Sequence, residues 1–191
     1  MLASERAFSL VEVMLVVLTI SVMAVSALLG TTTAFRRYQL ESATRTVAAQ
    51  VRSARLRAVT ANETMRVRFN CPAPGQLRIV QLVGTPAIDN AADRCSAAVY
   101  PYPDPDVAMA PNHDGPVVVL QGGISLESTP DIDIAPTGRI TAQTGGLPLT
   151  IVVSDTHETR SITITAAGRV VSDPHWTPSI TITEEHQGGG Y

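Results

Sequence analysis

The sequence predicts an α+β fold in which one long N-terminal helix packs on an antiparallel β-sheet head. Three observations predict it. No Pro occurs before Pro72, and Gly30 is the only Gly before Gly75, so an unbroken helix is permitted up to about Asn62. The first half of that segment is almost purely apolar. From Met65 onward the apolar residues alternate with polar ones, which is typical of strands.

The N-terminus begins with a short polar segment, residues 1–7, followed by an apolar run from Phe8 to Phe35. This run exceeds the roughly 20 residues that a helix needs to span a bilayer, so we expect 8–35 to be transmembrane. It is also longer than the apolar region of a cleaved secretory signal, about 7–15 residues. Small residues near Ala27 nevertheless leave signal cleavage open as an alternative.

Glu12 is the only charge between Phe8 and Phe35. A carboxylate inside an apolar span costs a few kcal/mol, so by default it indicates a functional site that has a partner. Glu12 is the fifth residue counted from Phe8. If the chain were cut between Ala7 and Phe8, the new α-amino group would lie one helical turn from Glu12. We therefore predict that Glu12 pairs with the α-amino group of a neighbouring subunit during assembly.

The motif Ala7-Phe8-Ser9-Leu10-Val11-Glu12 resembles the prepilin peptidase motif of type IV pilins and pseudopilins. That family usually has Gly before the cut, where this chain has Ala7. The resemblance implies a leader over 1–7, cleavage between Ala7 and Phe8, and N-methylation of Phe8. It implies prepilin peptidase, inner-membrane lipid and other minor and major pilins or pseudopilins as partners. It also implies a single-pass inner-membrane protein with a periplasmic head, which later enters a pilus or pseudopilus. Arg6 before the run and Arg36 with Arg37 after it favour the opposite orientation by the positive-inside rule, but a leader this short gives that rule little to count.

The second half of the predicted helix, residues 36–63, is amphipathic. Six apolar residues recur at helical spacing on one arc: Leu40, Ala43, Val47, Val51, Ala54 and Ala58. Glu41 precedes Arg45 by four residues, which is the favourable order for an ion pair on a helix surface. We expect the apolar arc to pack against the head.

The head, residues 64–191, is predicted to be β-rich and to end in a flexible tail. Residues 84–116 are rich in Pro, Asp, Asn and Ala, which predicts a long loop with little regular structure. The strand candidates are Met65–Phe69, Leu77–Val83, Val117–Leu120, Ile124–Leu126, Asp131–Ile134, Leu149–Ser154, Arg160–Thr165, Arg169–Val171 and Ser179–Thr183. Alternation within these segments predicts a half-buried antiparallel sheet.

Two segments of the head end in Gly-Arg after an alternating run: Ile134 to Arg139 and Ile162 to Arg169. Together with the Arg- and Ala-rich stem Val51 to Ala58, they resemble the H-type pseudopilin and T-type fimbrial family, the GspH/FimT type. In that family two strand-turn elements with Gly-Arg close the globular domain. The resemblance spans most of the chain and implies a minor pilin or pseudopilin.

Two cysteines, Cys71 and Cys95, are too few and too far apart for a zinc pattern, and no other metal or cofactor motif is present. If the head is exported, the oxidising compartment favours a disulfide between them; two free thiols are the alternative. Ser154, Asp155, His157 and Glu158 lie between two strand candidates, where polar turn residues belong, so we predict no enzymatic activity.

The charge of the chain and its arginine motifs bear on whether nucleic acid is a partner. All 14 basic residues are Arg, and the formal net charge is −3, which argues against a generic nucleic-acid binder. DNA-binding members of the family are described by Gly-Arg-x-Arg, but this chain has Gly168-Arg169-Val170-Val171.

The sequence thus predicts a structural subunit that primes or caps a type IV pilus or a type II secretion pseudopilus. A DNA-binding minor pilin for natural transformation and a simple anchored β domain are the alternatives. The sequence does not choose between the two fibre machines.

Overall fold

The computed structural model describes residues 9–103, 110–127, 129–165, 167–173 and 177–178, without the side chains of 26–32 and 177–178. The described chain is α+β, with one N-terminal helix and antiparallel sheets, as expected. Residues up to Tyr38 form one compact unit, and Gln39–Tyr191 form another.

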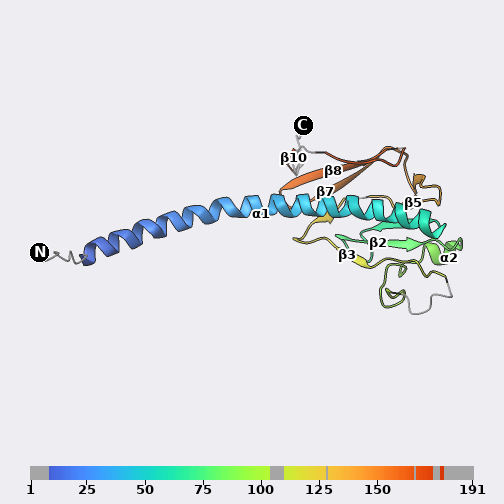
Figure 1. The fold of residues 1–191 in the computed structure, drawn as a ribbon, viewed down its shortest axis with the longest axis horizontal. Coiled ribbons are helices and arrows are strands. Elements are labelled where there is room, and N and C mark those ends of the chain that lie inside the picture. Colours follow the sequence, from blue (N-terminus) through green and yellow to red (C-terminus); the bar gives the residue numbers. More distant parts are fainter. Residues whose placement is uncertain (1–8, 104–109, 128, 166, 174–176, 179–191) are drawn as a thin grey trace, which may run out of the picture. The chain divides into compact units, whose positions relative to one another are not determined.

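Helix α1 runs from Leu10 to Ala61 without a break (Figure 1). Its C-terminal end is set by Asn62, which takes a left-handed φ of 56°, and by the Glu63 N–H, which donates to the Ala58 carbonyl at 3.2 Å. This is the pattern of a helix that ends in a left-handed residue. Asn adopts that conformation more readily than most residues, so the end of the helix is encoded locally.

The membrane span expected over 8–35 does not gain support from the structure. Within the part of the chain that is described, no helix combines the length and the apolar character needed to cross a membrane.

In the described residues the strands form two five-stranded antiparallel sheets, where the sequence had predicted one. Sheet A has the order β3-β2-β1-β5-β6, with β1 Met65–Phe69, β2 Gln76–Gln81, β3 Val117–Val119, β5 Ile132–Ile134 and β6 Ile140–Ala142. Sheet B has the order β10-β8-β7-β4, with β9 also paired to β8; its strands are β4 Ser125–Leu126, β7 Leu149–Ser154, β8 Glu158–Ile164, β9 Val170–Ser172 and β10 Thr177–Pro178. Strand periodicity identifies strands but does not say which of them pair, and this is why the prediction of a single sheet was wrong.

The core lies where the second half of α1 meets both sheets. All six residues of the predicted apolar arc are at most 5% exposed, and they share one cluster with residues such as Val67, Ile132, Ile151 and Ile162. In Figure 1 this part of α1 lies between β7 and β8 on one side and β2 and β3 on the other. Ala54 and Ala58 are fully buried, so the helix backbone approaches the strands closely at those positions.

Among its described residues, the segment 84–116 has little regular structure, as predicted. It contains one short helix, α2 Pro86–Asp89, and buries three of its charged side chains: Asp89, Arg94 and Asp114. Strands β6 and β10 were not predicted, whereas the candidate strand Ser179–Thr183 lies outside the described residues.

Candidate functional site

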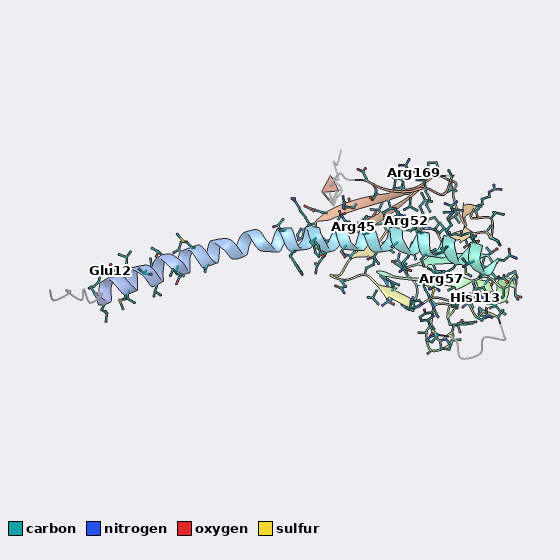
Figure 2. The ribbon with its side chains drawn as sticks, in the orientation of Figure 1. Glu12, Arg45, Arg52, Arg57, His113 and Arg169 are labelled. Atoms are coloured by element: carbon teal, nitrogen blue, oxygen red, sulfur yellow. A yellow bond between two sulfur atoms is a disulfide. The ribbon has the colours of Figure 1, made fainter. Side chains whose placement is uncertain are left out.

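The predicted processing and assembly residues lie at the beginning of α1. Ala7 and Phe8 fall outside the described residues, so their cleavage and methylation stay predictions. Glu12 lies exposed in the first turn of α1 (Figure 2), and its N–H donates to the Ser9 carbonyl at 2.9 Å. Ser9 and Glu12 therefore occupy the N-cap and third positions of the helix, the spacing of a capping box. A carboxylate in the first turn also complements the positive end of the helix dipole, a local role that the sequence analysis missed.

Around Glu12 the helix presents large apolar side chains on every side. Among the described side chains, Leu10, Val11, Met14, Leu18 and Met23 are each 65–73% exposed, and Leu15, Val17, Ile20, Val22 and Val25 are each more than half exposed. A helix that is apolar all round is normally buried in a larger assembly or in lipid. An exposed apolar surface of this extent is typical of sites that contact another protein or a membrane.

A disulfide joins Cys71 to Cys95, with their Cα atoms 5.6 Å apart. Cys71 follows the end of β1, and Cys95 lies fully buried in the segment 84–116. The bond thus ties that segment to sheet A. Closing a loop of 24 residues contributes on the order of 3 kcal/mol in the chain-entropy model.

A buried ionic cluster holds the same segment from a second direction. The Arg94 guanidinium donates to both carboxylate oxygens of Asp114, one of them at 2.8 Å, and to the Gln81 carbonyl at 2.8 Å. Arg78 donates to the carbonyls of Gly115 at 2.8 Å and Tyr100 at 2.6 Å. Burial lowers the pKa of Arg78, Asp114 counteracts this, and Arg94 adds to the lowering. Because Arg78 and Arg94 are both fully buried, this cluster has a structural role and holds the segment 84–116 in place.

The outer side of β1 carries two ion pairs with the segment around β5. Arg66 donates to both oxygens of Asp133, at 2.6 and 3.0 Å, and Arg68 donates to Asp131 at 3.2 Å. Burial alone would lower the pKa of Arg66, but the hydrogen bond and charge of Asp133, together with the charges of Asp131 and Asp89, outweigh it and raise that pKa. Burial raises the pKa of Asp131, and the Phe69 N–H and Arg68 offset this only in part.

The two Gly-Arg segments form matching hairpin turns. In the first, Ala135 N–H donates to the Arg139 carbonyl at 2.9 Å and Gly138 N–H to the Ala135 carbonyl at 2.8 Å. In the second, Thr165 N–H donates to the Arg169 carbonyl at 3.0 Å and Gly168 N–H to the Thr165 carbonyl at 2.8 Å. The two turns therefore have the same hydrogen-bond pattern and lie 30 residues apart in the sequence. The first joins β5 to β6 in sheet A, and the second joins β8 to β9 in sheet B.

Both turns meet the same side chain of α1, Arg55. The two glycines have left-handed φ values of 78° and 73°. A Cβ on Gly138 would lie 2.9 Å from Arg55 Nε, and one on Gly168 would lie 3.4 Å from an Arg55 Nη atom. The need for Gly is thus conformational at both turns. At Gly138 a Cβ would also require the exposed Arg55 guanidinium to shift, whereas at Gly168 it would make an ordinary contact.

Beside these turns lies a groove of about 630 Å³. Its lining includes Arg52, Arg55, Leu56 and Val59 of α1, Ile140 of β6, and Arg169 with Val170 at the start of β9. Figure 2 places Arg52 and Arg169 on α1 and the β8–β9 hairpin. We call this the basic groove. Sequence reasoning identified the Gly-Arg turns and the stem separately, but it did not bring them together.

The residues considered for catalysis form a hairpin turn. Asp155 N–H donates to the Glu158 carbonyl at 3.0 Å, the Thr156 hydroxyl donates to Asp155, and His157 is exposed at the tip between β7 and β8. In the described part of the chain, no group of three or more His, Cys, Asp or Glu side chains is placed to hold a metal ion.

Comparison with known proteins gives a distant likeness. No family model matches the chain, and no curated protein is significantly similar to it in sequence. Two crystal structures of the type IV minor pilin FimU from Pseudomonas aeruginosa, strain PAO1, resemble it at 16% identity. One has a TM-score of 0.46 and covers 73% of this chain and 91% of that one; the other has a TM-score of 0.41 and covers 70% and 92%. A likeness this distant establishes neither the family nor the function of the chain.

Proposed function

We propose that this chain is a structural subunit of a type IV pilin-like fibre, a minor pilin or pseudopilin, and not an enzyme. The observation that carries the proposal is the composition of α1. Its first half exposes apolar side chains on every side around one carboxylate, and its second half is part of the core of a β domain. A subunit that assembles through its helix and displays its β domain needs this division.

In this mechanism the first half of α1 packs against equivalent helices of neighbouring subunits. Burial of its apolar side chains drives the association, at roughly 25 cal/mol for each Å² of apolar surface removed from water. Glu12 lies in the first turn, where the α-amino group of a neighbour cleaved before Phe8 can reach it. Charges attract strongly in an apolar setting, so this pair fixes the register between helices.

Before assembly, we propose that the subunit waits in the inner membrane with its head in the periplasm. The apolar run of the sequence supports this stage. The Cys71–Cys95 disulfide fits an oxidising compartment such as the periplasm. The subunit would then prime or cap either a type IV pilus or a type II secretion pseudopilus.

The decisive experiment is intact-mass measurement and N-terminal sequencing of the full chain co-expressed with a prepilin peptidase. We expect a mature chain that begins at methylated Phe8. The matched control is the same expression without the peptidase, which should leave Met1 at the N-terminus. A chain that still begins at Met1 with the peptidase present, or that is cut near Ala27, contradicts the proposal.

A further inference from the structure

Among the described residues, no further strand pairs with the outer edge of β9, which lies beside the basic groove. Register pairs Ile164 with Val170 and Ile162 with Ser172, and the Asp173 N–H donates to the Ser161 carbonyl at 3.0 Å. In an antiparallel ladder hydrogen-bonded pairs alternate with non-bonded pairs, so the N–H and C=O of Val170 and Ser172 point away from β8. Consistent with this direction, the Val170 carbonyl accepts a hydrogen bond at 3.5 Å from Arg52, which lines the groove. An exposed edge of this kind can accept an additional strand.

The groove next to that edge carries uncompensated positive charge. In the described portion of the chain, no carboxylate forms an ion pair with Arg52, Arg55 or Arg169, all of them exposed. By contrast, Arg45 on the same helix pairs with Glu41 at 2.8 Å. The groove therefore attracts carboxylates from outside the domain.

Between the arginines the groove is apolar. Leu56 is 65% exposed and Val59 is 52% exposed, although both belong to the half of α1 that is built into the domain. Ile140 and Val170 continue this surface onto β6 and β9. Exposed apolar side chains beside an open sheet edge suit the alternate side chains of an extended peptide.

The lining argues against nucleic acid as the occupant. Single-stranded nucleic acids bind through aromatic side chains on which the bases stack, and no aromatic residue is among those that line the groove. A peptide uses all three features of the site, since its backbone matches the edge, its apolar side chains match Leu56 and Val59, and its carboxylates match the arginines.

We propose that the basic groove binds an extended acidic peptide segment of a partner protein, which adds as a strand to the outer edge of β9. Its carboxylates pair with Arg52, Arg55 and Arg169, and its alternate apolar side chains lie on Leu56 and Val59. This site goes beyond the proposed fibre function and does not depend on it, because every residue involved belongs to the unit Gln39–Tyr191.

The test measures the fluorescence anisotropy of labelled eight-residue peptides with the full chain in a mild detergent. A peptide alternating Glu and Val should bind, and the matched peptide alternating Gln and Val should bind about tenfold more weakly, because charge-assisted hydrogen bonds are lost. Binding should weaken as salt is raised. N-methylation of alternate backbone nitrogens on the Glu-Val peptide should also weaken binding at least about tenfold, because each edge hydrogen bond removed leaves a carbonyl unpaired.

Substitutions of the groove arginines test whether the peptide binds in the basic groove. Arg52→Gln and Arg169→Gln should each weaken the Glu-Val peptide roughly threefold, as expected for exposed ion pairs, and the double variant roughly tenfold. The matched control is Arg45→Gln, which removes an arginine that is 78% exposed on the same helix but outside the groove, and it should leave binding unchanged. Equal binding by the double variant and the control overturns the proposal. So does equal binding of the Glu-Val and Gln-Val peptides, or tighter binding of an oligothymidylate than of the Glu-Val peptide.

Discussion

The two halves of α1 share one helix but have opposite environments. Between Leu10 and Val25 the large apolar side chains are 48–73% exposed, whereas the arc from Leu40 to Ala58 is at most 5% exposed. The difference lies in patterning: the first half is apolar all round, and the second confines its buried side chains to one stripe between arginines. A stripe can be satisfied within one domain, whereas an all-round apolar surface needs a partner outside it.

The largest expected effect comes from placing a carboxylate in each half. Val47→Asp buries an unpaired charge where Val47 is fully buried, so it should lower the free energy of unfolding by about 5 kcal/mol. The matched variant Val17→Asp changes a side chain that is 58% exposed and should leave domain stability unchanged while preventing assembly. Urea unfolding followed by circular dichroism checks the first outcome, and recovery in the sheared fibre fraction checks the second.

If Val17→Asp destabilised the domain as much as Val47→Asp, the two halves would not be energetically separate. If Val17→Asp assembled normally, the first half of α1 would not be the assembly surface.

A smaller effect is expected from the one charge in the first half. Glu12→Ala should reduce recovery in the fibre fraction more than about tenfold, since breaking a buried ion pair costs about 3–5 kcal/mol. Domain stability should not change, because Glu12 lies in the other unit of the chain. Glu63→Ala, which removes an exposed carboxylate just after α1 ends, is the matched control. Normal assembly of Glu12→Ala would reject the pairing role and leave only the local role of Glu12 in the first helical turn.

The smallest expected effect is a pH dependence confined to the domain. Because the pKa of Asp131 is raised in the folded state, that state holds the proton more tightly than the unfolded chain does. The contribution of Asp131 to stability therefore falls as pH rises from about 4, its ordinary unfolded value, through its raised folded value.

The variant Asp131→Asn should remove this slope, whereas Asp93→Asn, at an exposed site, should keep it. Thermal unfolding measured between pH 3 and pH 7 checks this, and identical slopes in both variants would mean that another group is responsible.

Much of the fold could be predicted because its signals are local. The absence of Pro and the 3.6-residue period gave one helix up to about Asn62 and its buried arc, and the structure confirms both. The alternation of Met65–Phe69 and Leu149–Ser154 gave two strands with the bounds that the structure has. The ion pair of Glu41 with Arg45 could also be predicted from the sequence, because residues four apart lie about one turn from each other on a helix.

The rest depended on contacts between distant parts of the chain. Alternation in Arg66 and Arg68 predicted a strand but not their partners Asp133 and Asp131, which lie more than 60 residues away. The Pro-rich segment 84–116 gave no sign that Arg94 would be buried, because its partners Asp114 and Gln81 lie 20 and 13 residues away in the sequence. The Glu12 pairing and the cleavage at Ala7 stay predictions, since they concern other subunits and residues outside the described chain.

The sequence by itself determined the long helix, its change from all-round apolar to one-sided, and most of the strands, because backbone propensity and periodicity act over a few residues. Only the tertiary structure decided that the strands divide into two sheets and that two Gly-Arg turns 30 residues apart meet one arginine of α1. The physical reason is that strand pairing and burial of charge are chosen by the free energy of the whole packed domain, which no short segment contains.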